Sequence, residues 1–210
     1  MMVLSMVLAF VLAYLLGNLN GAIVISRLIA HEDVRSKGSG NAGLTNFTRN
    51  YGSAGTVFVI LIDVGKAALA CLIGGLLLKR YGLYEEGVAM GGLGVILGHD
   101  FPALLGFKGG KGILCGAAVA FTVDWRVGLI AAALFFGLYF LTGYVSLGSL
   151  VASVCFGVGF AAFNLGNVWV MAAGIFMALL AIFMHRENIK RLLTGTERKS
   201  NLFSKAKKEE

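Results

Sequence analysis

Four polar segments of this sequence contain the residue types that bind phosphate. The first runs from Ser36 to Asn50 and combines glycines with serine, threonine and asparagine side chains and one arginine. Glycines allow backbone N–H groups to converge on an anion, and an arginine presents a fork of donors that matches a phosphate. We therefore predict a phosphate-binding loop, whereas the alternative is an ordinary polar connection. The predicted donors are Ser39, Gly40, Asn41, Gly43, Thr45, Asn46 and Arg49.

The glycines of this segment also imitate a dinucleotide fingerprint. Gly38, Gly40 and Gly43 have the G-x-G-x-x-G spacing, and Asp63 follows further along the chain. That fingerprint carries meaning only between a strand and a helix of a βαβ unit. Here an apolar helix precedes the glycines, so we reject dinucleotide binding.

The second segment runs from Gly98 to Gly112 and resembles a phosphate-binding P-loop. Leu105 stands where that motif has its first glycine, and Gly112 replaces the residue that would hold magnesium. We therefore do not expect nucleotide hydrolysis. We do expect a positively charged loop that binds an anion. Its predicted ligand-binding residues are Lys108, Gly109, Gly110 and Lys111. The alternative is a bare loop whose lysines reach the lipid headgroups.

His99 and Asp100 form a further pair in this segment. A histidine beside an aspartate could act as a base and its orienting group, but sequence neighbours often point apart. We favour a structural role for both residues.

Two shorter segments complete the set. Ser146 lies at the expected start of a helix, where hydroxyls by themselves favour a capping role. His185 and Asn188 are three residues apart and share one helix face, while the neighbouring arginines and lysines suit lipid headgroups. Taken alone, this last segment is a basic helix beside the membrane.

Composition places these segments on a membrane protein. Of the 210 residues, 58% are hydrophobic and 14% are charged, whereas a soluble domain has about 25% charged residues. Lipid solvates the excess apolar surface, and the 30 glycines allow close helix packing. The net charge of +7 forms no basic stripe, which excludes nucleic-acid binding. The single cysteines Cys71, Cys115 and Cys155 predict neither a disulfide nor a metal site.

Hydropathy predicts an all-α polytopic fold of about seven transmembrane helices, since each span needs about 20 apolar residues. The expected first span is broken at the polar patch Asn18 to Asn20, and the fourth is short. The expected spans are Val3–Ile29, Ala54–Leu78, Gly87–Leu105, Ile113–Val123, Val127–Leu141, Ser146–Phe163 and Val168–Met184.

Charge predicts the orientation of these helices. Lysines and arginines gather in the first loop, in the gap before the fourth span and after the seventh, where eight of the 18 follow His185. Since positive loops stay in the cytoplasm, we expect the N-terminus outside and the C-terminus inside. No basic residue precedes Arg27, so the first span is expected to remain attached. We expect one transmembrane catalytic domain over 1–184 and a basic cytoplasmic segment, partly disordered, over 185–210.

One charged pair lies inside an expected span. Asp63 and Lys66 are spaced i, i+3 within an apolar run. Charges in a membrane are usually paired or face a polar cavity. Pairing with each other is favoured over a direct catalytic role.

Together these segments resemble the PlsY family of bacterial acyl-phosphate:glycerol-3-phosphate acyltransferases. The resemblance spans nearly the whole chain and is carried by 38–49, 98–102, 106–112, Ser146 and 185–191. This sequence departs from the family pattern at Leu44, Ala67 and the pair Leu114-Cys115, which bears on packing more than on chemistry.

The resemblance implies transfer of a fatty acyl group from acyl phosphate to glycerol 3-phosphate, giving lysophosphatidic acid and phosphate, as the first step of phospholipid synthesis. It implies neither metal nor cofactor, a monomer among membrane lipids, and a site on the cytoplasmic side of the bacterial inner membrane. The implied core of the site is Ser39, Arg49, Lys108, Ser146, His185 and Asn188, with Ser39, His185 and Asn188 as catalytic residues.

The residue chemistry fits this activity. Two phosphates in one site require several cations, and the candidates are Arg35, Lys37, Arg49, Lys108 and Lys111. Acyl phosphate has a good leaving group, so positioning and charge neutralisation can supply much of the rate. The proton acceptor is then the substrate phosphate, with His185 as the alternative.

Two rival functions remain. One is an anion transporter, although the halves show no repeat and the polar motifs lie at one edge. The other is an acyltransferase that uses a coenzyme A or acyl-carrier donor. No histidine here has an aspartate five residues later, so the base motif of the other glycerolipid acyltransferases is absent.

Overall fold

The computed structural model describes residues 1–200, and this part of the chain is all-helical. The last ten residues of the predicted C-terminal segment lie outside the described residues. The helices are α1 (Met2–Gly17), α2 (Gly21–Ala30), α3 (Leu44–Tyr51), α4 (Thr56–Lys79), α5 (Tyr84–Asp100), α6 (Ile113–Val123), α7 (Trp125–Thr142), α8 (Val145–Phe163), α9 (Val168–Met184) and α10 (Arg186–Leu193), with short 3-10 turns η1 (Val34–Ser36) and η2 (Ala103–Leu105).

Every segment predicted to span the membrane is helical, and the fourth and seventh have the expected bounds. Five helices or joined helices are long and apolar enough to cross a bilayer, and α9 with α10 makes a sixth if that bent pair counts as one span. The fourth predicted span, α6, has only 11 residues. At about 1.5 Å per residue it covers roughly half of the hydrocarbon core.

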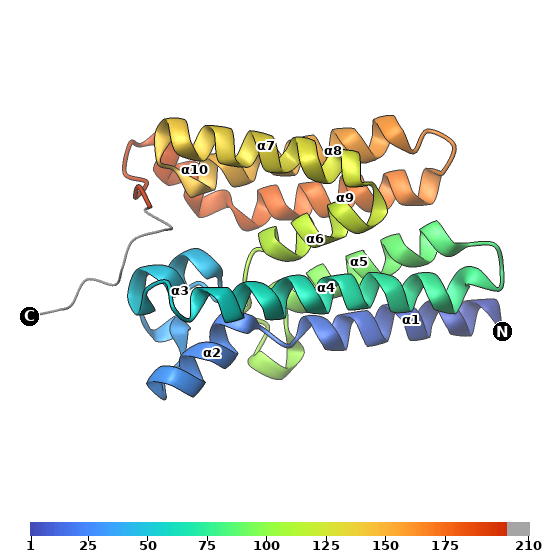
Figure 1. The fold of residues 1–210 in the computed structure, drawn as a ribbon, viewed down its shortest axis with the longest axis horizontal. Coiled ribbons are helices and arrows are strands. Elements are labelled where there is room, and N and C mark those ends of the chain that lie inside the picture. Colours follow the sequence, from blue (N-terminus) through green and yellow to red (C-terminus); the bar gives the residue numbers. More distant parts are fainter. Residues whose placement is uncertain (201–210) are drawn as a thin grey trace, which may run out of the picture.

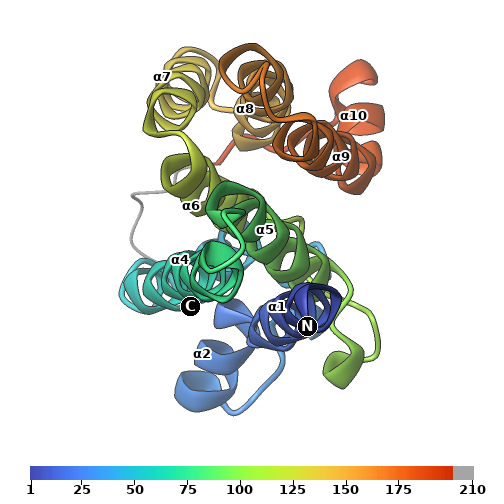
Figure 2. The same cartoon turned by 90° about the vertical axis from the view of Figure 1, so that its right-hand side faces the viewer.

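The helices form two groups joined by α6. Viewed along the long axis, α1, α4 and α5 lie together, and α7, α8 and α9 form the second group (Figure 2). Helix α6 contacts α4, α5 and α7, and α5 also contacts α9. Apolar side chains on the outer faces, such as Leu61, Phe140 and Val158, are exposed, as lipid contact requires.

Glycine allows the helices of the first group to approach closely. A side chain on Gly74 of α4 would lie 2.1 Å from the carbonyl oxygen of Gly87 on α5. A side chain on Gly98 of α5 would lie 2.1 Å from that of Tyr14 on α1. The high glycine content therefore serves helix packing, as the composition predicted.

The first span is two helices separated at Asn18 to Asn20, which confirms the predicted break. The structure differs from the sequence predictions at two other places. The third span ends at Asp100 rather than Leu105, because Pro102 cannot continue a helix and η2 follows. The first loop contains α3, a short helix that the glycine-rich composition concealed.

All four polar segments lie at one end of the long axis (Figure 1). The loop between α2 and α4, the loop between α5 and α6, the start of α8 and the junction of α9 with α10 meet there. Met1 and α10 lie at opposite ends of the molecule (Figure 1), as an odd number of crossings requires. Which end faces the cytoplasm stays a prediction.

Candidate active site

The first two phosphate-binding segments are in direct contact. Arg35 donates through Nη1 to the carbonyl oxygens of Leu105 (2.8 Å) and Lys108 (2.9 Å). A side chain on Gly110 would lie 3.0 Å from the carbonyl oxygen of Ala42. The loops at 36–49 and 106–112 therefore form one surface, although Arg35 and Leu105 are 70 residues apart in the sequence.

The break between α1 and α2 positions both loops. Asn20 caps α2 by accepting from the Ile23 amide (3.0 Å), and its amide group donates to the carbonyl oxygen of Ala42 (2.9 Å). Asn18 accepts a hydrogen bond from the Leu104 amide (3.0 Å). The polar patch within the first span thus connects the membrane helices to each phosphate-binding loop.

The pair Asp63 and Lys66 stabilises this same break. The Lys66 ammonium lies 2.8 Å from Asp63 Oδ1, which confirms the predicted pairing. It also donates to the carbonyl oxygens of Gly17 (3.3 Å) and Leu19 (2.6 Å), while Asp63 Oδ1 accepts from the Gly21 amide (3.1 Å). A cation at the carboxyl end of α1 and an anion at the amino end of α2 both match the helix dipoles.

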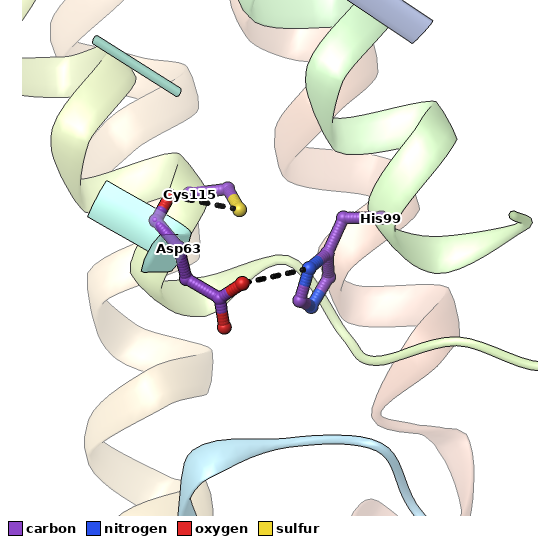
Figure 3. A group of neighbouring side chains, drawn as sticks. All are labelled: Asp63, His99 and Cys115. Atoms are coloured by element: carbon purple, nitrogen blue, oxygen red, sulfur yellow. Dashed lines mark hydrogen bonds and ion pairs between the residues drawn. The ribbon is translucent and has the colours of Figure 1, made fainter. Parts of the chain in front are cut away.

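His99 completes this buried group, which we call the inner cluster (Asp63, Lys66 and His99). His99 Nδ1 lies 2.9 Å from Lys66 Nζ and 3.7 Å from Asp63 Oδ1, and Figure 3 shows the Asp63 carboxylate pointing toward its ring. All three residues are less than 5% exposed. The two carboxylate oxygens of Asp100 accept no hydrogen bond from the described residues. His99 therefore pairs with α4 and not with Asp100, which favours the structural role.

Cys115 lies beside the inner cluster and raises the question of a metal. Ligand atoms of Asp63, His99 and Cys115 lie within 4.8 Å of one another (Figure 3). The Lys66 ammonium contacts two of these three ligands, so a positive charge already neutralises the carboxylate. The Cys115 thiol donates to the carbonyl oxygen of Asp63 (3.5 Å), which leaves it a packing role.

Asn46 organises the first loop from within. Its amide group donates to three carbonyl oxygens, those of Val34, Lys37 and Asn41, each at 3.1 Å. Its side-chain oxygen accepts from the Ser39 amide (2.9 Å) and from Asn50 (3.1 Å). Since an asparagine has two donors and two lone pairs, Asn46 is saturated by the loop. The loop leaves the hydroxyls of Ser39 and Thr45 without a hydrogen-bond partner among the described residues.

The glycines of the second loop were predicted to offer their amides to an anion, but their amides bond to the end of α5. The Gly109 amide donates to the carbonyl oxygen of Asp100 (3.2 Å) and the Gly110 amide to that of His99 (3.0 Å). A side chain would lie 1.9 Å from the His99 carbonyl at Gly109, and 2.1 Å from His99 Nε2 at Gly110. These amides are therefore not free for a ligand, and the glycines allow the loop to pack on the end of α5.

A second charged group, which we call the site cluster, joins α8, α10 and the chain that follows α10. Its centre is the Glu197 carboxylate, which accepts from Ser146 Oγ (2.9 Å), Asn188 Nδ2 (2.9 Å) and Arg191 Nε (2.7 Å). Ser146 therefore does not cap α8, the role that its position alone favoured. Burial raises the pKa of Glu197, but these hydrogen bonds outweigh it and hold the pKa below its usual value. The carboxylate is ionised.

Lys111 and His185 complete the site cluster, whose members are Lys111, Ser146, His185, Asn188, Arg191 and Glu197. Lys111 donates to Asn188 Oδ1, so Asn188 is held between a cation and an anion. Burial, with a contribution from Arg191, lowers the pKa of Lys111 to about 8. His185 Nδ1 lies 2.8 Å from the carbonyl oxygen of Ala181. A carbonyl only accepts, so Nδ1 donates and Nε2 is left for a ligand.

The five cations predicted for phosphate fall into two sets. Arg35 pairs with Asp33 (2.9 Å) and Lys37 pairs with Glu32 (2.6 Å), so both stabilise the first loop. Arg49 donates to the carbonyl oxygen of Arg198 (3.1 Å), beside Glu197. Lys108 is exposed, and its ammonium forms no ion pair with the acidic side chains of residues 1–200. Of these five cations, Arg49, Lys108 and Lys111 form no ion pair with the acidic side chains of residues 1–200 and are left for a ligand.

Sequence reasoning missed Glu197. The segment after α10 was predicted to be a basic tail, and Glu197 is an isolated acid among cations. Its contact with Ser146 spans 51 residues, and no local spacing rule connects them. The one sequence feature that could have indicated its role is an acidic side chain within a strongly basic segment.

Comparison with known proteins identifies the family of this chain. The family model for glycerol-3-phosphate acyltransferase matches residues 7–195. The glycerol-3-phosphate acyltransferase of Thermoanaerobacter sp. strain X514 is 42% identical over 184 residues, which cover 87% of this chain and 89% of that protein. The glycerol-3-phosphate acyltransferase of Aquifex aeolicus strain VF5 is 39% identical over 183 residues, which cover 85% of this chain and 93% of that protein.

Two crystal structures share the fold. They are the glycerol 3-phosphate and lysophosphatidic acid forms of PlsY (YgiH), an integral membrane glycerol 3-phosphate acyltransferase, with TM-scores of 0.85 and 0.82 and identities of 36% and 34%. Each comparison covers 94% of this chain and 96% of the other. With four separate polar segments meeting at one end of a helical membrane domain, the chain belongs to the family of integral membrane glycerol-3-phosphate acyltransferases.

Proposed function

We propose that this acyltransferase takes its acyl group from a fatty acyl phosphate and forms lysophosphatidic acid and inorganic phosphate. The observation that carries the proposal is the set of cations at one end of the molecule. Arg49 of α3 donates to the carbonyl oxygen of Arg198, next to Glu197. Lys108 and Lys111 share the loop before α6, where Lys111 donates to Asn188. Glycerol 3-phosphate and acyl phosphate each bring a phosphate, and a shared site must neutralise both. A thioester donor would leave no phosphate at the reacting carbon.

The reaction then proceeds by direct transfer. The acceptor hydroxyl oxygen of glycerol 3-phosphate attacks the carbonyl carbon of the donor, and the bond from that carbon to the phosphate oxygen breaks. The hydroxyl proton passes to the departing phosphate, or to His185 Nε2 in the alternative. Because phosphate is a good leaving group, orientation and charge neutralisation supply most of the acceleration.

The side chains divide into ligand-binding and supporting groups. Arg49, Lys108 and Lys111 hold phosphate oxygens. Ser146 joins them when its hydroxyl turns from Glu197 to the substrate, and His185 joins them when Nε2 carries a second proton. Ser39 and Asn188 orient the acceptor hydroxyl or the acyl carbonyl. Thr45 lies on the first turn of α3, where unpaired amides attract anions. Gly40, Asn41, Gly43, Asn46, Gly109 and Gly110 shape the two loops that present these groups.

We also propose that the site end faces the cytoplasm of a bacterial inner membrane and that the enzyme acts as a monomer. The support is the positive charge of the loops at this end. The described residues supply every group of the proposed site from one chain.

A purified-protein assay tests the donor. The protein in detergent is given glycerol 3-phosphate with palmitoyl phosphate, palmitoyl coenzyme A or palmitoyl acyl-carrier protein, and both phosphate and lysophosphatidic acid are measured. We expect product from acyl phosphate alone, with one phosphate released for each lysophosphatidic acid. Product from either thioester at a comparable rate would refute the acyl-phosphate donor.

The same assay tests the site. Arg49→Ala and Lys108→Ala each remove one cation and are expected to lower activity at low substrate by about 10²- to 10³-fold. Lys79→Ala is the matched control, because Lys79 is exposed at the opposite end of α4. Full activity of both site variants would show that these loops do not bind the substrates.

A further inference from the structure

An apolar groove leads away from the site cluster between α6 and the second helix group. Its volume is about 170 Å³. Gly112 and helix α6 as far as Ala120 line one side, and residues of α7, α8 and α9 line the others. Lys111 lines the groove at its site end, and Ala117 on its wall is exposed. The groove therefore connects the cations to the lipid-facing surface.

The length of α6, which forms one wall of the groove, corresponds to one leaflet. Helix α6 has 11 residues and is about 16 Å long at 1.5 Å per residue. A hydrocarbon core of about 30 Å gives about 15 Å to each leaflet. A fatty chain whose phosphate is bound at Lys111 would thus lie along α6 within its own leaflet. This occupant rests on the proposed donor.

Gly116 differs from the other glycines around this groove. A side chain on Gly112 would lie 3.1 Å from Asp100 Oδ1, and one on Gly128 would lie 2.7 Å from the Phe121 ring. A side chain on Gly116 would meet nothing within 4 Å. Gly116 has an ordinary helical backbone, since it is not among the glycines with positive φ.

Gly116 is therefore required neither by packing nor by backbone conformation. A glycine inside a helix costs about 1 kcal/mol relative to alanine, so the fold alone favours a side chain there. The space that such a side chain would fill is the groove itself, because Gly116 is one of its lining residues. It lies about halfway between Gly112 and Ala120.

We propose that Gly116 is a specificity-determining residue: its bare backbone keeps the groove open at half depth and thereby admits long acyl chains. A side chain at this position blocks the deeper half. Short acyl donors are less affected, because less of their chain extends past Gly116. A long acyl chain must then leave the groove, or the phosphate of the donor must shift away from the cations that bind it.

The test compares Gly116→Leu with Gly137→Leu. A side chain on Gly137 of α7 would also meet nothing within 4 Å, but Gly137 is exposed and does not line the groove. Purified variants are assayed in detergent with octanoyl, lauroyl and palmitoyl phosphate. In Gly116→Leu, kcat/KM for palmitoyl phosphate is expected to fall at least about tenfold relative to octanoyl phosphate. Gly137→Leu keeps the wild-type ratio.

The outcomes separate this inference from the proposed function. If the wild-type protein uses no acyl phosphate, the proposed donor is wrong. If it does and Gly116→Leu keeps the wild-type ratio, or loses activity equally with all three donors, the assignment of Gly116 is overturned. Should Gly116→Leu not fold, Gly116→Ala is measured instead. It must shift the ratio in the same direction by a smaller amount.

Discussion

The inner cluster and the site cluster are built from the same residue types and differ in access. Each contains a lysine, a histidine and a carboxylate. In the inner cluster, Lys66 is 4% exposed and its ammonium contacts two backbone carbonyls and two side chains. In the site cluster, Lys111 is only partly buried and lines an open groove. The inner cluster is sealed from ligands and can only stabilise the fold. The site cluster is accessible, so its side chains can bind a ligand.

The difference also appears in the sequence separation of the partners. Asp63 and Lys66 are neighbours on one helix, so local spacing predicts their contact. Lys111 and Asn188 are 77 residues apart, and the structure brings them together only when α9 packs against α5 and α8, and α10 against α8 and α9. A cluster that is assembled from distant segments, as the site cluster is, exists only in the folded chain.

The largest effect is expected from breaking the inner cluster. Lys66→Met leaves the buried Asp63 carboxylate unpaired, which costs about 3–5 kcal/mol and lowers the midpoint of thermal unfolding in detergent. The double variant Asp63→Asn with Lys66→Met recovers part of the loss, because no charge remains buried. Lys79→Met, at an exposed position of the same helix, serves as the control. A Lys66→Met protein as stable as wild type would contradict the structural role.

The next effect is expected at the centre of the site cluster. Glu197→Gln keeps the shape of the side chain but removes the charge that orients Ser146 and Asn188. We expect kcat/KM for glycerol 3-phosphate to fall roughly 10- to 100-fold, because hydrogen bonds to a charged group contribute about 1.5–3 kcal/mol. Glu187→Gln, at an exposed position of α10, is the matched control. Equal kinetics for the two variants would remove Glu197 from the positioning of the site.

A smaller effect is expected from pH. The pKa of Lys111 is lowered to about 8 by burial, so its ammonium loses a proton as pH rises through that value. Loss of the cation weakens anion binding, and kcat/KM for glycerol 3-phosphate should fall several-fold above about pH 8. Lys111→Arg moves this alkaline limb to higher pH, since a guanidinium stays protonated. An unchanged limb in Lys111→Arg would assign the titration to another group.

The smallest effect is expected at Cys115. Its thiol donates only a weak hydrogen bond to the Asp63 carbonyl, so Cys115→Ala should keep activity within about twofold. Elemental analysis of wild type and variant should show the same metal content. A metal that is bound by wild type and lost from Cys115→Ala, together with activity, would make the inner cluster a metal site.

Local sequence patterns predicted much of this molecule. Hydropathy located the membrane helices and the break at Asn18 to Asn20, because burial in lipid acts on each segment separately. Charge and glycine content placed the polar segments at one end, which the structure confirms (Figure 1). The same patterns located the short helix α6 with its observed bounds, but they did not reveal α3, whose glycine-rich flanks conceal a short helix.

What the sequence determined by itself was therefore the membrane helices, the break at Asn18 to Asn20 and the polar segments that lie at one end of the molecule. The tertiary structure alone decided which polar groups are consumed by the fold and which remain for a ligand. Asn46, Gly109 and Gly110 looked like ligand-binding groups in the sequence. The hydrogen bonds of Asn46 go to the first loop instead, and those of the Gly109 and Gly110 amides go to the end of α5. Glu197 looked like part of a tail and lies at the centre of the site. The physical reason is that a polar group is satisfied by whichever partner packing brings within about 3 Å, and packing joins segments that no local pattern relates.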